Sequence, residues 1–105
     1  MDTKEQQINI ELTEEVSEGV YSNLAIISHS PTEFIIDFVQ MLPGLPKAKV
    51  RSRIITTPGH AKRLLIALSE NIDRFEQNFG AISVENRQGN DFSAGGFGGS
   101  NTGYA

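Results

Sequence analysis

The hydrophobic positions of this chain change period near its middle, from a strand-like to a helix-like spacing. Residues 33–42 alternate, which places Phe34, Ile36 and Phe38 on one side of a predicted strand. Beyond Thr57 the apolar residues recur at the spacing of one helix face: Ala61, Leu64, Leu65, Leu68, Ile72, Phe75 and Phe79. The pattern therefore predicts strands first and one long amphipathic helix after them.

Both ends of the predicted helix carry recognisable signals. Thr57 can cap the helix, and Pro58 suits the first helical position because its missing N–H would have no partner there. Gly80 provides the stop. The helix is therefore expected between Pro58 and Gly80.

Three further segments are predicted as strands. Residues 8–12 alternate, residues 20–28 are rich in strand-favouring side chains, and residues 47–55 alternate basic with mostly apolar positions. The order β-β-β-β-α with hairpin spacing predicts an α+β fold, an antiparallel β-meander with one C-terminal amphipathic helix packed on one sheet face. Val50 and Ile54 should join the Phe34 side beneath the helix, with either Leu24 and Ile26 or Ala25 and Ile27 beside them.

The opposite sheet face is expected to carry Ile35 and Val39 among charged side chains. A mixed apolar and charged face in so small a domain favours an interface, and a second copy is the simplest occupant. The sequence therefore predicts a homodimer through Ile35 and Val39.

The chain divides into a single domain and two polar ends. We expect a disordered N-terminus over residues 1–7, one α+β domain over residues 8–80, and a disordered Gly/Asn/Ser-rich tail over residues 81–105. The tail offers few apolar side chains to offset the entropy of ordering its backbone.

Composition narrows the function classes. The chain has 105 residues and no cysteine, which excludes disulfides, thiolate metal sites and a thiol nucleophile. It shows neither an apolar run of membrane-spanning length nor a secretory signal, so a cytoplasmic location is expected, with no membrane partner. No motif indicates catalysis, a metal or a cofactor, and we expect a protein that is not an enzyme.

Charge is segregated along the chain. The net charge of the chain is −4. Residues 47–63 nevertheless contain no acid and six bases: Lys47, Lys49, Arg51, Arg53, Lys62 and Arg63. The first four would line one face of a strand, an arrangement that suits a phosphate backbone. Glu33 and Asp37 on the neighbouring strand offer the alternative of cross-strand pairing, and aromatic residues for base stacking are missing from this face.

The helix start is a second, weaker candidate for anion binding. Thr57, Gly59 and His60 present backbone N–H groups at the positive end of the helix dipole. Ordinary capping is the alternative, because no glycine-rich phosphate loop precedes the helix.

Several short segments resemble a bacterial family without assigned function, catalogued as domain of unknown function 3467. The resemblance covers roughly residues 8–79 and rests on Gly19-Val20-Tyr21-Ser22-Asn23, Ser28-His29-Ser30, Pro43-Gly44 and the segment from Thr57 to Leu64. It implies a compact bacterial protein and brings no catalytic residues. The strand and helix order is also similar to PUR and Whirly single-strand nucleic-acid modules, a likeness of topology that does not set function.

The sequence thus predicts a small non-enzymatic binding module, a homodimer whose basic strand binds single-stranded nucleic acid or another polyanion. The alternative is a protein–protein adaptor or accessory subunit of a larger complex, such as the transcription machinery.

Overall fold

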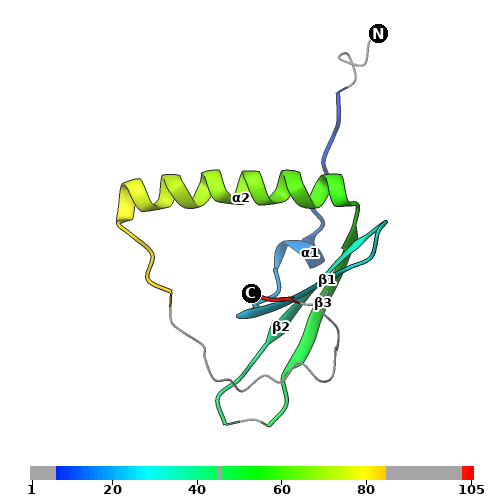
Figure 1. Cartoon of the computed structure of the whole chain (residues 1–105), viewed down its shortest axis with the longest axis vertical. Coiled ribbons are helices and arrows are strands. Elements are labelled where there is room, and N and C mark those ends of the chain that lie inside the picture. Colours follow the sequence, from blue (N-terminus) through cyan, green and yellow to red (C-terminus); the bar gives the residue numbers. More distant parts are fainter. Residues whose placement is uncertain (1–6, 45, 85–102) are drawn as a thin grey trace.

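The computed structural model of the chain describes residues 7–44, 46–84 and 103–105. Its helices and strands, labelled in Figure 1, are α1 Glu14–Ser17, β1 Leu24–His29, β2 Phe34–Gln40, β3 Lys49–Thr56, α2 Pro58–Phe79 and β4 Gly103–Tyr104. The strands form one open antiparallel sheet in the order β3-β2-β1-β4. The α+β class with an antiparallel meander and a long helix after it is confirmed.

The N-terminal strand predicted over residues 8–12 is not formed. These residues are extended without pairing, and Ile8, Ile10 and Leu12 are largely exposed. A single turn of helix, α1, follows them, and the side chain of Thr13 caps it by accepting the N–H of Val16 at 3.2 Å. The alternating pattern here has no neighbouring strand to complete it.

The fourth strand comes instead from the other end of the chain. In β4, Tyr104 lies opposite Ile26 and Gly103 opposite Ile27, and Ala105 exchanges backbone hydrogen bonds with Ala25. The prediction of a disordered tail therefore does not hold for residues 103–105. Its portion from 85 to 102, and residues 1–6 of the predicted disordered N-terminus, lie outside the described residues.

The register of the strands defines two sheet faces. The inner face, which faces α2, carries Phe34, Ile36 and Phe38 of β2; the outer face carries Ile35, Asp37 and Val39. β1 adds Ala25 and Ile27 to the inner face and Leu24 and Ile26 to the outer face, which resolves the alternative that the sequence left open.

β3 contains a bulge that changes its alternation. Ser52 lies opposite Phe38 and Val50 lies opposite Val39, so Arg51 is one extra residue between them. Ile54 and Ser52 are on the inner face, but Val50 is moved to the outer face, contrary to the prediction.

The best-buried side chains gather on the outer face. Leu24, Ile26 and Val39 form the hydrophobic core cluster, with Met41 packed against it. Asp37 is buried among them with only 3% of its surface exposed. The core of the described chain thus belongs to the sheet and not to a helix–sheet layer.

α2 begins and ends where the sequence predicts, but it does not cover the sheet. A single residue, Thr57, joins β3 to the helix, and α2 and the strands leave this junction in diverging directions (Figure 1). No residue of the 22-residue helix is buried. The expected packing of α2 on its own sheet face is therefore corrected: the helix stands apart.

Candidate interaction surface

The bulge divides the predicted line of positive charge. Lys49 lies opposite Gln40, whose place in β2 is on the inner face, and Arg51 donates to Gln40 Oε1 at 2.8 Å. Arg53 lies on the outer face, opposite Asp37. The prediction that Lys47, Lys49, Arg51 and Arg53 share one face is wrong, because the extra residue reverses the alternation between Arg53 and Lys49.

Arg53 is also neutralised. Its guanidinium donates two hydrogen bonds to Asp37, from Nε to Oδ1 at 2.7 Å and from Nη2 to Oδ2 at 2.9 Å. The hydrogen bond to Asp37 and then the negative charge of Asp37 raise the pKa of Arg53 above its ordinary value. Cross-strand pairing therefore holds for Arg53 and Asp37, and it gives a buried carboxylate its partner.

The remaining bases lie in two separate places. Lys47 and Lys49 are exposed before and at the start of β3, whereas Lys62 and Arg63 are exposed in the first turns of α2. The eight residues of β3 separate the two groups, about 26 Å at the rise of a strand. The described bases do not form one continuous track.

The helix start is occupied by ordinary capping. Thr57 Oγ1 accepts the N–H of His60 at 3.1 Å, and the Thr57 carbonyl accepts the N–H of Ala61 at 3.0 Å. Pro58 has no N–H, which leaves the amide of Gly59. The arrangement matches the capping alternative rather than a built anion site.

The predicted interface residues lie on the buried side of the sheet. Val39 is 2% exposed and belongs to the core cluster, and Ile35 is half-buried. Val39 offers little surface to a partner in this protomer, and the interface through Ile35 and Val39 stays a prediction.

The exposed apolar surface is on α2. We call its helical face the apolar stripe, formed by Ala61, Leu64, Leu65, Leu68, Ile72, Phe75 and Phe79. Leu68 is 54%, Phe75 48% and Phe79 75% exposed. An amphipathic helix gains most of its stability in proteins from packing such a stripe, so this one is incomplete as it stands.

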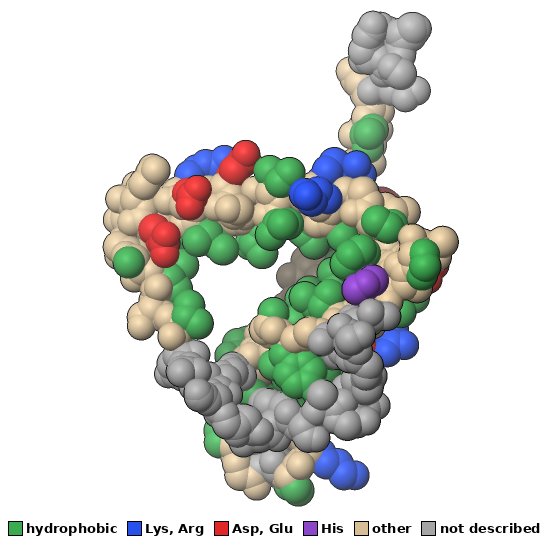
Figure 2. All heavy atoms as spheres, in the orientation of Figure 1, with side chains coloured by type: hydrophobic (Ala, Val, Ile, Leu, Met, Phe, Trp, Pro, Cys, Tyr) green, Lys and Arg blue, Asp and Glu red, His purple; other side chains and the backbone are tan. Residues whose placement is uncertain are grey.

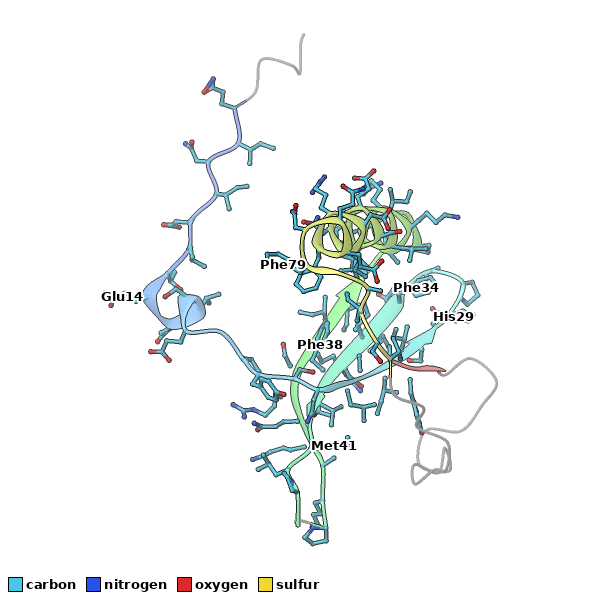
Figure 3. All side chains as sticks on the ribbon, turned by 90° about the vertical axis from the view of Figure 1, so that its left-hand side faces the viewer. Glu14, His29, Phe34, Phe38, Met41 and Phe79 are labelled. Carbon is cyan, nitrogen blue, oxygen red and sulfur yellow. The ribbon has the colours of Figure 1, made fainter. Side chains whose placement is uncertain are left out.

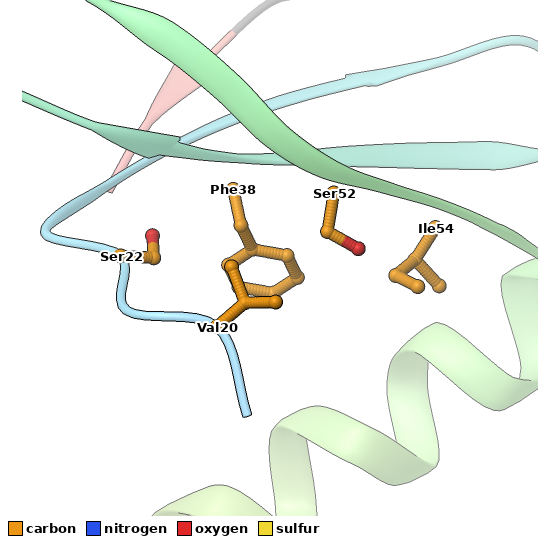
Figure 4. A pocket seen from close by; sticks show the side chains of 5 residues that line it. All are labelled: Val20, Ser22, Phe38, Ser52 and Ile54. Carbon is orange, nitrogen blue, oxygen red and sulfur yellow. The ribbon is translucent and has the colours of Figure 1, made fainter. Parts of the chain in front are cut away.

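The inner sheet face presents an apolar hollow next to the stripe. Val20, Ser22, Phe38, Ser52 and Ile54 line an open pocket of about 260 Å³. In Figure 4 the side chains of Phe38, Ser52 and Ile54 project from the sheet on the side of α2, and Val20 approaches Phe38 from the segment before β1. The hollow is largely apolar, with two serine hydroxyls at its wall.

Between α2 and the sheet the molecule is open. Figure 2 shows this opening with hydrophobic side chains along the border formed by α2. Figure 3 shows that the N-terminal segment with Glu14 also runs away from the strands that carry Phe34 and Phe38. The apolar stripe and the inner face together form one concave surface, which we call the α2–sheet surface.

Neither histidine indicates metal chemistry. His29 is the last residue of β1, and its ring stacks on Phe34 with centroids 5.3 Å apart. Within the described ranges no group of three His, Cys, Asp or Glu side chains comes together as a metal site would require. Over the same part of the chain, no helix has the length and apolar character needed to cross a membrane.

Part of the α2–sheet surface could be predicted from the sequence. The stripe residues were identified by their spacing, but no pattern in the sequence says that the stripe and the sheet diverge. A single residue, Thr57, joins β3 to α2 in this geometry.

Comparison with known proteins identifies a family. The family model described as a protein of unknown function, DUF3467, matches residues 1–84. No curated protein and no solved structure matches the chain, so the topological likeness to PUR and Whirly modules has no support from these comparisons.

Proposed function

The chain belongs to the DUF3467 family, and within that family of unknown function we propose that it is a non-enzymatic module that works by binding protein through the α2–sheet surface. The observation that carries this proposal is the exposure of the six large apolar side chains in the stripe of α2, Leu64, Leu65, Leu68, Ile72, Phe75 and Phe79. A contiguous apolar surface of this size is typical of a protein interface.

The proposal shares with the adaptor alternative only that the chain binds protein, and it uses a different face. On the outer face, Val39 belongs to the protomer's own core and Asp37 is paired with Arg53. The α2–sheet surface is apolar at its centre, and Lys62, Asp73 and other charged side chains of α2 lie outside the stripe. An apolar centre with a charged rim is the usual anatomy of a protein–protein contact.

Site-specific photocrosslinking in the native cells tests the proposal. A benzophenone amino acid at Phe75 sits within the stripe, and the same group at Ile66 lies about 180° around the helix. We expect protein adducts from position 75 and few from position 66. No adduct at position 75, or equal adducts at both, would overturn the proposal.

Binding of single-stranded nucleic acid or another polyanion is the second candidate. Its support is the exposure of Lys47, Lys49, Lys62 and Arg63, for which no ion pair is formed among the described residues. This candidate ranks second because the four bases lie in two separate places and because Arg53 is paired with Asp37.

Oligonucleotide retention at low salt tests this candidate. Replacing Lys47 and Lys49 with serine should reduce the slope of log K against log salt by about 0.7 for each phosphate that is no longer neutralised. If the unmodified chain retains no oligonucleotide, the candidate is excluded. We further expect the protein to act in the cytoplasm, as the sequence predicts.

A further inference from the structure

The occupant of the α2–sheet surface can be specified further. We propose that it is a second copy of this chain, bound so that the two α2 helices run antiparallel about a twofold axis near Leu68. The inference rests on the proposed function and names its partner. Each apolar stripe then packs against α2 and the inner sheet face of the other copy.

The size of the exposed surface fits a stable dimer. The stripe residues Leu64, Leu65, Leu68, Ile72, Phe75 and Phe79 leave about 600 Å² exposed, taking about 200 Å² for a fully exposed large apolar side chain. Val20 and Ile54, which line the neighbouring hollow, raise this to about 800 Å². A standard stable interface buries about 800 Å² on each partner.

The shape of the surface favours self-association. One chain displays both a projecting apolar helix and an apolar hollow, and the two do not cover each other. A twofold arrangement uses the same patch on both copies, so two incomplete surfaces complete each other at once.

The charges along α2 indicate the direction of pairing. Lys62 and Arg63 lie near its N-terminus, and no acid lies in the first turn and no base in the last turn. Further along, three acids, Glu70, Asp73 and Glu76, accompany a single base, Arg74. This order opposes the helix dipole, which favours acids at the N-terminus and bases at the C-terminus. An antiparallel α2 from a second copy would compensate this unfavourable order, because the acidic half of each helix lies beside the basic end of the other.

One pair of residues fits the antiparallel register. Lys62 and Asp73 are 11 positions apart, so they lie within about 20° of each other on the same flank of the stripe. In an antiparallel helix pair the same flanks face each other. Lys62 of one copy then meets Asp73 of the other when the axis passes between them, near Leu68. Within the described residues, neither side chain forms an ion pair in the protomer.

Sedimentation of the purified full chain at tens of micromolar is the first test. We expect a dimer for the unmodified protein, a dimer affinity at least tenfold weaker for Ile72→Asp, and little change for Ile66→Asp. Both isoleucines are exposed on α2, about 120° apart around the helix axis, which makes the second variant a matched control. A folded monomer for the unmodified chain would overturn the inference.

Exchanging the charges of Lys62 and Asp73 tests the dimer in a way that a folding defect cannot imitate. Lys62→Glu alone and Asp73→Lys alone should each weaken the dimer several-fold, because each places like charges together across the axis. The double variant restores opposite charges and should recover most of the affinity. Additive losses in the double variant would contradict the antiparallel register.

The absence of cysteine allows a direct geometric measurement. Spin labels on Ser69→Cys lie near the proposed axis, whereas labels on Asn78→Cys are about 30 Å apart along the helix axes in an antiparallel dimer. We expect a much shorter label distance for position 69. Equal distances for both positions would indicate a parallel pair and reject the proposal.

The outcomes separate this inference from the proposed function. Crosslinked adducts at position 75 with the mass of two chains support both. Adducts with a different protein, together with a monomeric purified chain, would overturn the second-copy inference and leave the proposed function standing. No adducts and a monomer would remove both.

Discussion

Arg53 and Asp37 face each other across β2 and β3 and are joined by two parallel hydrogen bonds, although Asp37 is buried and Arg53 is mostly exposed. The pair fixes a planar fork on a carboxylate that has left water, an arrangement that lysine cannot reproduce. Arg53 is therefore a structural residue of the sheet more than a free positive charge.

The pH dependence of stability should reflect this pair. Because the folded-state pKa of Arg53 is raised, its contribution is fully present below the ordinary arginine pKa and is lost only as pH rises through the raised value. The melting temperature should therefore show no loss from Arg53 between about pH 7 and pH 10. Arg53→Lys should lower the melting temperature at neutral pH and lower it further above about pH 10, as lysine loses its charge. Parallel pH profiles for the two proteins would contradict the assignment.

Truncating Val39 should weaken the fold itself. Val39→Ala removes two methyl groups from the core cluster and should lower the free energy of unfolding by about 1–3 kcal/mol. Val16→Ala is the matched control, because Val16 lies exposed on α1. This substitution should change the free energy of unfolding by less than about 0.5 kcal/mol. Urea denaturation measures both. Equal effects would mean that Val39 is not a core residue.

The capping hydroxyl of Thr57 should contribute measurably to α2. Thr57→Ala leaves the His60 amide without its acceptor and should cost about 1 kcal/mol of unfolding free energy. Thr57→Ser keeps the oxygen and should cost far less. If both variants lose the same amount, the methyl group rather than the hydrogen bond is responsible.

The pairing of β4 can be measured one amide at a time. Deleting residues 103–105 should speed hydrogen exchange at the Ala25 N–H, which donates to the Ala105 carbonyl. The Asn23 N–H, which donates to Val39, should keep its protection. Unchanged exchange at Ala25 would show that β4 does not protect the edge of β1 in solution.

Periodicity predicted the elements whose partners are near in sequence. The alternation of Phe34, Ile36 and Phe38 and the signals at Thr57 and Gly80 depend on the local backbone, and the structure follows them. Gly80 ends α2 with a φ of 99°, a conformation that suits glycine.

The prediction was wrong where the outcome depends on distant partners. Residues 8–12 alternate like a strand, but the sheet edge beside β1 is taken by β4. The bulge at Arg51 reverses the alternation of β3, and no residue type marks it in advance. The stripe of α2 showed that the helix needs an apolar partner, but spacing alone could not say that its own sheet lies out of reach.

The position of β3 at the edge of the sheet gives its basic residues a second consequence. An open edge strand of eight residues presents unpaired backbone groups that could template pairing with the edge of another molecule. Lys49 and Arg51 beside a bulge interrupt that template, since lysine side chains and irregular twist both discourage edge-to-edge pairing. Replacing these bases with apolar residues would therefore first cause aggregation. The positive charge of β3 helps to keep the protein dispersed at the concentrations at which it is made.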